Sequence, residues 1–461
     1  MPEALETDYL VVGAGLAGLA FVDSLLDATD ADVVLVDRRH APGGHWLDAY
    51  PFVRLHQPSA WYGVGSAGLD DDRLEVDGDE AGQYARVTGV ELQAYFARVL
   101  RDRFLASGRV RYLPMSEHLG EGRVRSLLGD GETEVRARRA VVDATYTPSE
   151  TPETYAPPFL VGDGAHVVTP AGLTRLDRDG PLVVVGTGKT AFDTCAWLLE
   201  QGCPPERITW VRTREAWLNN RFFLQPGVLA GQTIEGTVLW LEALAAAESV
   251  DAVYERLEEQ RVVFRVDPGV WPTVFRGPTI SAGELDRLRR VRDVVRLGRL
   301  LEAHPERMVL EQGEVPVAPG SVYVHCAAPG LTRNPPVPVF GTGRITIQYL
   351  SRSSMSLSSA AIARVAALAV PEEEKNRLCP PVPPPQTPLS YLRMLLTGLA
   401  TENAWRGHPQ LGPWLESNRV NVTRSIRGED RGRERKALYA RLFEAVGPAY
   451  ASLARLSDEP G

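Results

Sequence analysis

The sequence is poor in the residues from which disulfide frameworks, zinc sites and redox dithiols are built. Its 461 residues include only four cysteines, and these are scattered without a C-x-x-C pair. Because such scaffolds need closely spaced thiols, the scarcity argues against all three and favours a reducing, cytoplasmic environment. We therefore expect no metal site.

Long apolar runs and an excess of positive charge are missing as well. The stretches LVVVG and DVVLVD have the length of strands, which is too short to cross a bilayer. The opening MPEALETDYL is acidic and lacks the basic and apolar regions of a signal peptide. The formal net charge is -9, whereas nucleic-acid binders usually present a basic face. We expect neither a membrane nor a nucleic acid as partner.

What the sequence does contain is two similar units, each an apolar strand, a glycine-rich turn and an amphipathic helix. The first is DYLVVGAGLAGLAFVDSLL and the second is PLVVVGTGKTAFDTCAWLLEQG, which begins at Pro181. Such a unit opens a βαβ fold. A connector rich in proline and glycine, from Thr147 to Gly164, lies between them. The pattern predicts an α/β protein with two Rossmann-like dinucleotide-binding domains.

The first glycine cluster has the spacing G-x-G-x-x-G between a strand and a helix. The first glycine permits a tight turn, the second lets a pyrophosphate approach, and the third lets helix and strand pack closely. Asp37 ends the next strand, 19 residues after Gly18, where a carboxylate can accept a hydrogen bond from a ribose. A turn that binds nothing would not account for Asp37. The predicted contacts are Gly13, Ala14, Gly15, Leu16, Ala17, Gly18, Asp37 and Arg38.

The second cluster carries alanine in place of the third glycine, which the pattern allows. GTGKT also suggests a P-loop, but the first glycine of that motif would fall at position 183, which is Val183. Arg212 occupies the position that corresponds to Asp37, and an arginine can pair with a 2'-phosphate. NADPH is thus favoured over NADH, against the alternative of a solvated basic turn. The predicted contacts are Gly186, Thr187, Gly188, Lys189, Thr190, Arg212, Thr213 and Arg214.

Two dinucleotide sites in one chain suit a flavin that stays bound and a second dinucleotide that binds, donates a hydride and leaves. FAD is the natural resident because a flavin accepts a hydride and passes electrons on to oxygen or substrate. The stretch GGHWLDAYPFVRLHQPSAWYG, residues 43–63, crowds polar and aromatic side chains without helical or strand periodicity. Gly44, His45 and Trp46 are expected against the flavin. His56 and Gln57 are expected to act on substrate, although His56 is equally well interpreted as a structural histidine.

These motifs resemble those of the flavin-containing and Baeyer–Villiger monooxygenases. GAGLAG is similar to their FAD motif, GTGKTA to their NADPH motif and GGHW to their G-G-x-W, and the likeness covers residues 8–62, 141–217 and 320–350. The sequence also resembles bacterial FAD/NAD(P)-binding proteins to which no reaction is assigned. It departs from the Baeyer–Villiger pattern at His56, where that family has aspartate. Of the fingerprint motif of that family, only Phe159, Gly162 and His166 are present.

The resemblance implies an FAD-dependent oxidoreductase whose NADPH-reduced flavin reacts with molecular oxygen. A flavin-peroxide would then oxygenate a small molecule, and one oxygen atom would leave as water. Arg276, before Gly277, is the candidate for the arginine that stabilises negative charge, against the alternative of a surface arginine. Ala144 and Gln348 are further expected flavin contacts. The alternatives are an NADPH-linked flavin dehydrogenase or reductase without oxygen transfer, and a non-catalytic dinucleotide-binding protein.

The expected domains follow from these units. Residues 1–165 and 318–375 form a discontinuous FAD domain, and residues 166–317 form an inserted NADPH domain with a helical insert. Residues 376–461 form a helical C-terminal appendage after a proline-rich linker. A homodimer would be ordinary for such an enzyme.

Overall fold

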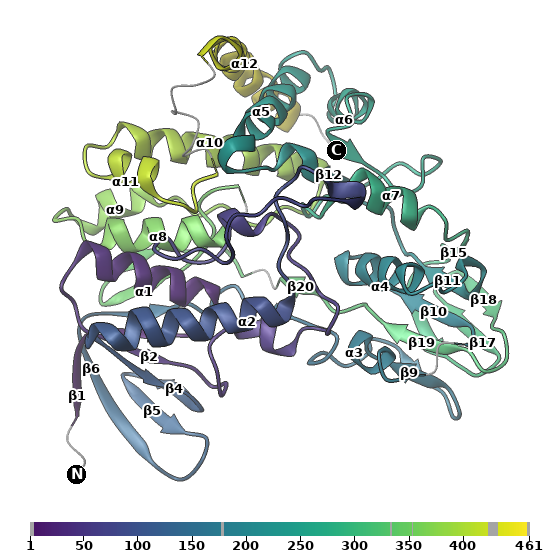
Figure 1. Ribbon diagram of the computed structural model, residues 1–461, viewed down its shortest axis with the longest axis horizontal. Coiled ribbons are helices and arrows are strands. Elements are labelled where there is room, and N and C mark those ends of the chain that lie inside the picture. The colour runs from purple at the N-terminus through teal and green to yellow at the C-terminus, as the bar shows by residue number, and fades with distance from the viewer. Residues whose placement is uncertain (1–3, 177–178, 332–333, 353, 423–431, 459–461) are drawn as a thin grey trace.

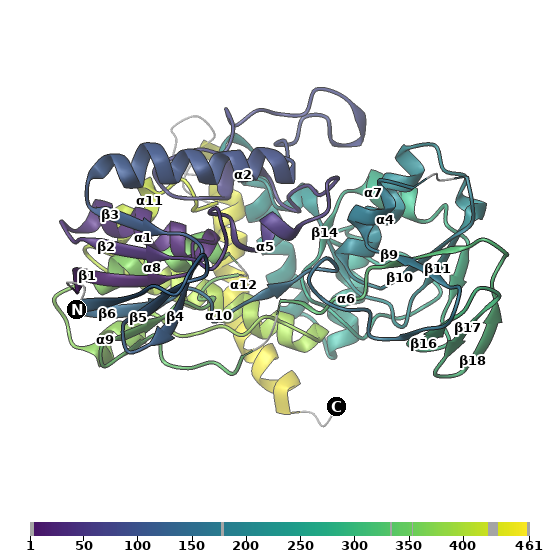
Figure 2. The ribbon, with the colours of Figure 1, turned by 90° about the horizontal axis from the view of Figure 1, so that it is seen from below.

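The computed structural model describes residues 4–176, 179–331, 334–352, 354–422 and 432–458. Three bodies are visible in Figure 1. The first lobe and the second lobe are each built on a parallel β-sheet, and the helical lobe covers one edge of both. Figure 2 shows the two sheets on opposite sides of the molecule. The predicted α/β fold is confirmed.

The first lobe contains a sheet in the order β21-β22-β6-β1-β2-β3, from which β4 and β5 extend beside β6. The central strands are parallel, and all four residues of β2 are buried, as expected of a sheet covered on both faces. The strands are β1 (Leu5–Val12), β2 (Val33–Val36), β3 (Val110–Leu113), β4 (Ser116–Gly120), β5 (Arg123–Ser126), β6 (Glu132–Asp143), β21 (Phe340–Gly341) and β22 (Arg344–Thr346).

Three helices cover this sheet. Helix α1 (Leu16–Ala28) starts directly at the first glycine turn and packs against α8 (Met355–Ala366), from far along the chain. The Ser24 hydroxyl donates to the Ala360 carbonyl over 2.9 Å, which joins the two helices inside the core. Helix α2 (Gly89–Arg98) begins with a capping box between Thr88 and Glu91.

The second lobe is built on a sheet in the order β15-β11-β10-β19-β9, with every pair parallel. Its strands are β9 (His166–Val168), β10 (Leu182–Val185), β11 (Ile208–Val211), β15 (Asp293–Val295) and β19 (Val322–His325). Two small sheets flank it, made of β8 (Leu160–Val161), β16 (Leu300–Ala303), β17 (Arg307–Leu310) and β18 (Gly313–Pro316), and of β12 (Leu218–Asn220), β13 (Val263–Phe264) and β14 (Thr279–Ile280). Its helices are α3 (Pro170–Leu173), α4 (Lys189–Glu200) and α7 (Ala282–Leu288).

The chain crosses between the two lobes at one place. Strands β7 (Ser149–Glu150) and β20 (Gly330–Leu331) pair with each other, one on the way out and one on the way back. Strand β19 pairs with β10, and β8 pairs with β16, so both belong to the second lobe. The sequence-based boundaries at 165 and 318 had assigned these two strands to the FAD domain. Sequence composition marks a connector, whereas strand pairing decides on which side of it a strand lies.

The helical lobe joins a segment inserted in the second lobe to the C-terminal part of the chain. Helices α5 (Ala230–Ala245) and α6 (Val250–Glu259) share a hydrophobic core with α10 (Pro388–Gly407) and α12 (Gly432–Asp458). At the surface, Arg441 of α12 pairs with Glu242 of α5 over 2.7 Å. Helices α9 (Glu372–Leu378) and α11 (Leu411–Ser417) complete it. No helix in the described ranges is both long and apolar enough to span a membrane.

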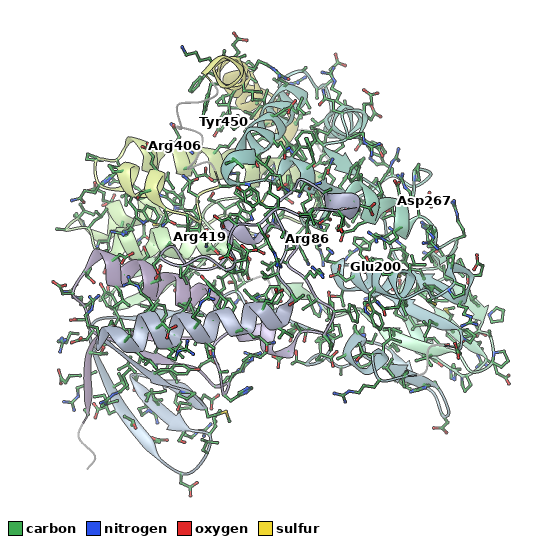
Figure 3. All side chains as sticks on the ribbon, in the orientation of Figure 1. Arg86, Glu200, Asp267, Arg406, Arg419 and Tyr450 are labelled. Atoms are coloured by element: carbon green, nitrogen blue, oxygen red, sulfur yellow. The ribbon has the colours of Figure 1, made fainter. Side chains whose placement is uncertain are left out.

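A buried network of charged side chains ties the first lobe to the second. Arg221, which is fully buried, pairs with Glu80 of the first lobe and, over 2.7 Å, with Glu284 of the second. Arg86 pairs with the same two carboxylates, over 3.0 Å and 3.4 Å respectively. Arg86 lies near the middle of the molecule in Figure 3. We call these four residues the interdomain ion cluster.

The cluster continues toward the second glycine turn. Lys189, the first residue of α4, pairs with Asp193 one turn later and lies 3.9 Å from Glu284. The hydroxyl of Tyr50, from the first lobe, donates to Asp193 over 2.7 Å. Burial raises the pKa of Glu284, but the charges of Arg221, Lys189 and Arg86 outweigh it and hold this pKa well below the usual range.

Replacing Arg221 with methionine tests how far the lobes depend on this cluster. The substitution would leave the carboxylates of Glu80 and Glu284 close together with fewer positive charges. Removing one partner of a buried ion pair costs about 3–5 kcal/mol, so we expect a clearly lower thermal unfolding midpoint. The matched control is Arg441→Met at the exposed pair with Glu242, where a loss of at most about 1 kcal/mol is expected. Equal shifts in the two variants would contradict a structural role of the cluster.

Candidate functional site

A cavity of about 1310 Å³ is lined by residues of both lobes. It exceeds the range of about 300–1,000 Å³ typical of a pocket for one small molecule. Both glycine turns face it, as do parts of the 43–63 stretch. The proline-rich linker before α10 contributes Pro384 and Pro385, so it is also part of the wall.

The first glycine turn is held in a geometry that its residues require. Gly13 has a φ of 106°, a conformation that favours glycine. A Cβ on Gly18 would overlap the carbonyl oxygen of Gly13, which is why the third position must be bare. Helix α1 has Gly15 as its N-cap and no side-chain cap, so its first N–H groups remain available to an anion.

Asp37 accepts hydrogen bonds from the turn that follows β1 and from the turn that follows β2, and it faces the cavity. The backbone N–H of Ala14 donates to Oδ2 over 2.6 Å, and that of Arg39 donates to Oδ1 over 2.8 Å. Asp37 is 6% exposed and lines the cavity. A carboxylate oxygen accepts more than one hydrogen bond, so Asp37 retains capacity for a ribose hydroxyl.

The second glycine turn is similar in form but more open. A Cβ on Gly186 would approach the Cys326 carbonyl oxygen to 2.6 Å, whereas one on Gly188 would meet nothing within 4 Å. The indole of Trp210 donates to the Gly186 carbonyl over 2.9 Å and thereby fixes the turn. Helix α4 has Gly188 as its N-cap, again without a side-chain cap. Backbone N–H groups and empty space therefore meet at this helix end, as anion binding requires.

Arg212 and Arg214, the two arginines that follow β11, lie in different environments. Arg212 is 1% exposed, donates to Glu215 over 2.6 Å and stacks 4.5 Å from the ring centre of Trp210. It does not line the cavity. Thr213 and Arg214 are exposed and do line it. The side chain that can meet a ligand is thus Arg214.

The 43–63 stretch packs onto the first glycine turn. The N–H of Gly43 donates to the Ala14 carbonyl over 2.9 Å. Trp46 lines the cavity, and its indole donates to the Tyr62 hydroxyl over 3.0 Å. Burial, helped by the charge of Arg39, lowers the pKa of His45 to about 4. This imidazole is therefore neutral at physiological pH.

His56, Gln57 and Arg276 all line the same cavity. Burial lowers the pKa of His56 well below its usual value, and the charges of Lys189 and Arg221 lower it further, against the opposing effect of Glu284. The His56 imidazole is consequently neutral as well. Arg276 is exposed within the cavity. Among the described residues, no group of three or more His, Cys, Asp and Glu side chains could hold a metal ion.

The structure brings all but four of the predicted site residues to the cavity wall; those four are Ala14, Gly18, Arg212 and Gln348. Ala14 and Gly18 belong to the first glycine turn but lie on the side of it that faces away from the cavity wall. Gln348 is turned away, since its amide pairs with both the N–H and the carbonyl of Val337. A residue following a strand can face either side, and sequence alone does not decide which.

Several residues at the site were not predicted. Arg419, near the C-terminus, is buried and donates to the carbonyls of Tyr62 (2.7 Å), Ala60 (2.9 Å) and Val64 (3.2 Å). It holds the 59–64 segment in place, and no local pattern in the sequence marks it. His118 of β4 lines the cavity, and its Nε2 is buried without a partner in the described part of the chain.

Comparison with known proteins agrees with this architecture. Residues 11–61 match the family described as the NAD(P)-binding Rossmann-like domain. The open crystal structure of cyclohexanone monooxygenase is similar with a TM-score of 0.52 at 12% identity, covering 96% of this chain and 99% of that one. Oxidised steroid monooxygenase bound to NADP gives a TM-score of 0.50 at 15% identity, with 96% and 98% covered. The chain has the fold of the flavin-dependent monooxygenases, as the sequence motifs predicted.

Closer relatives are found among mycobacteria. Proteins of Mycobacterium bovis and Mycobacterium tuberculosis, both described as uncharacterised, are 40% identical over 459 residues. The alignment covers 99% of this chain and 85% of each relative. The chain belongs to the family of these mycobacterial proteins.

A matched pair of glycine substitutions tests the two turns. Gly18→Ala places a methyl group against the Gly13 carbonyl, so we expect a loss of about 3 kcal/mol and a lower thermal unfolding midpoint. Gly188→Ala enters open space, and loss of a glycine N-cap costs at most about 1 kcal/mol. Both are measured by thermal unfolding. If Gly188→Ala were the more destabilising, the described geometry of the turns would be wrong.

Proposed function

We propose that the protein is an FAD-dependent oxidoreductase that uses NADPH and molecular oxygen to oxygenate a small molecule. The observation that carries this proposal is one cavity faced by two glycine turns, each opening a helix without a side-chain cap. Two dinucleotides held at these turns would share the space between the lobes. When bound, the flavin would supply the redox chemistry and the reaction with oxygen.

The residues of the first turn fit FAD. The free N–H groups of α1 suit a pyrophosphate, and Asp37 suits a ribose hydroxyl. Gly44 lines the cavity beside this turn, and Trp46 offers an aromatic wall. Leu16, Ala17, Arg38, His45, Ala144 and the unpartnered His118 line the same cavity. We assign this side of the cavity to FAD.

The residues of the second turn fit NADPH. Gly188 leaves room for a pyrophosphate at the start of α4, and Arg214 with Thr213 offers a cation and a hydroxyl to a 2'-phosphate. Arg212 precedes this pair and is itself held inside the protein by Glu215 and Trp210. Arg299 lines the cavity too, where it pairs with Glu311 over 2.7 Å.

Replacing Arg214 with alanine tests this assignment. A charge-assisted contact contributes about 1.5–3 kcal/mol, so the NADPH concentration needed for half-maximal flavin reduction should rise about 10-fold or more. The value for NADH should change less than about 2-fold, because NADH lacks the 2'-phosphate. Both are measured by anaerobic bleaching of the flavin absorbance. A similar rise for NADH and NADPH would show that Arg214 does not bind the phosphate.

Between the side of the cavity assigned to FAD and the side assigned to NADPH, this chain has two neutral hydrogen-bonding side chains and one cation. His56 is neutral and can donate or accept a hydrogen bond, and Gln57 can do the same. Arg276 can stabilise negative charge that develops during the reaction. Tyr50 and Trp46 wall the cavity and restrict water.

The reaction of the reduced protein with oxygen distinguishes a monooxygenase from a flavin dehydrogenase. The purified protein is reduced anaerobically with one equivalent of NADPH and then mixed rapidly with oxygenated buffer. We expect oxygen to be consumed before the absorbance of oxidised flavin returns. Simultaneous return of that absorbance with stoichiometric hydrogen peroxide would favour the dehydrogenase. Failure of NADPH to reduce the flavin would exclude both.

We propose that the protein acts in the cytoplasm. All four cysteines are buried and none forms a disulfide, which suits a reducing environment. The partners in this proposal are the small-molecule substrate and oxygen.

A further inference from the structure

A second cavity, of about 120 Å³, adjoins the large one. The two cavities share Gln57 and Gly277 in their walls. The smaller one, which we call the side cavity, is formed where α5 and α10 of the helical lobe meet β12. Its apolar wall includes Phe223, Trp240 and Leu395.

The charges in the wall of the side cavity neutralise each other. Arg352 forms a two-pronged ion pair with Glu402, with distances of 3.0 Å and 2.8 Å. The hydroxyl of Ser351 donates to the same carboxylate. Burial raises the pKa of Glu402, but Arg352 outweighs this and holds it below the usual range. Among the described residues of this wall, a charged ligand would find no unpaired opposite charge, and its desolvation would be costly.

Two hydrogen-bond donors in the wall lack partners among the described residues. The indole Nε1 of Trp61 is buried and unpartnered. Asn219 is 6% exposed, and its Oδ1 accepts from the Tyr391 hydroxyl over 3.1 Å. That bond orients the amide and leaves Nδ2, which no other described residue accepts from, as its donor. Unpaired donors of this kind favour a ligand that carries a hydrogen-bond acceptor.

The size of the side cavity limits what enters it. An apolar protein cavity of about 150 Å³ accommodates a benzene molecule. The side cavity is slightly smaller, so it suits a single ring or a compact branched group. A longer molecule could extend through the shared boundary, past Gln57 and Gly277, into the large cavity.

We propose that the side cavity is the specificity pocket for the substrate and selects an uncharged, compact, ring-sized group bearing one hydrogen-bond acceptor. This rests on the proposed function. A group seated there would direct its other end toward Gln57, at the boundary with the large cavity. Arg276 directly precedes Gly277, so the expected cation also lies at this boundary.

The proposal is tested by measuring how tightly four probes of similar size bind to the oxidised holoprotein. Saturation-transfer NMR reports the binding. The probes are benzonitrile, ethylbenzene, benzoate and benzylammonium. Benzonitrile should bind tightest, about 2–10-fold tighter than ethylbenzene, since one net hydrogen bond contributes about 0.5–1.5 kcal/mol. Both ions should bind at least 10-fold more weakly than benzonitrile. Equal or tighter binding of either ion would overturn the proposal.

Two variants test whether benzonitrile binds in the side cavity. Thr237 of α5 lines the side cavity, and its hydroxyl donates to the Thr233 carbonyl of its own helix. Thr237→Phe should fill the cavity and weaken benzonitrile binding at least 10-fold, whereas the control Thr397→Phe, at an exposed position of α10, should not. Asn219→Leu should bring benzonitrile and ethylbenzene within about 2-fold of each other.

Unchanged benzonitrile binding in Thr237→Phe would overturn the proposal. If that variant fails to fold, the Asn219→Leu result decides, and an undiminished preference for benzonitrile would count against the pocket. Probe binding needs neither NADPH nor oxygen. Failure of the wild-type flavin to be reduced would therefore overturn the proposed function while leaving the probe results to judge the pocket.

Discussion

The guanidinium of Arg221 is the contact on which the arrangement of the two lobes depends. It bridges carboxylates from both lobes, Glu80 and Glu284, and its Nε donates to the carbonyl of His56 over 2.8 Å. The large cavity takes its walls from both lobes, so its shape exists only while they are held together. A buried charge that lost a partner would be strongly unfavourable, so the pair with Glu80 favours the arrangement in which the two lobes meet at Arg221.

The same cluster sets the chemistry near the shared boundary. Lys189 and Arg221 place positive charge close to His56, and this charge acts with burial to keep the imidazole neutral. Arg419 donates to the backbone carbonyls of Ser59, Ala60, Tyr62 and Val64 and fixes the segment that carries Tyr62. Residues 43–63 are thus held by two arginines from distant parts of the chain, Arg221 and Arg419. Part of the polar character of this stretch therefore serves to hold it in place.

How much of this the sequence predicts depends on how local each feature is. The glycine turns and Asp37 are local, because a strand, a turn and a helix within about thirty residues determine them. The orientation of Arg212 is not local. The Arg212 side chain pairs with Glu215 and stacks on Trp210 of its own strand, so it turns away from the cavity, and Arg214 lines the cavity instead. The assignment of β19 depended on pairing with β10, which composition cannot reveal.

The side cavity was beyond prediction because it is assembled from segments that are far apart in sequence. Asn219 precedes the helical insert, Thr237 lies inside it, and Tyr391 and Glu402 come from α10. Neither dinucleotide turn contributes a residue to its wall. A change in α5 or α10 can therefore alter which molecule is accepted without disturbing the glycine turns or Asp37. The fold thereby separates the two glycine turns, at which we propose that the dinucleotides bind, from the choice of substrate, which we assign to the helical lobe.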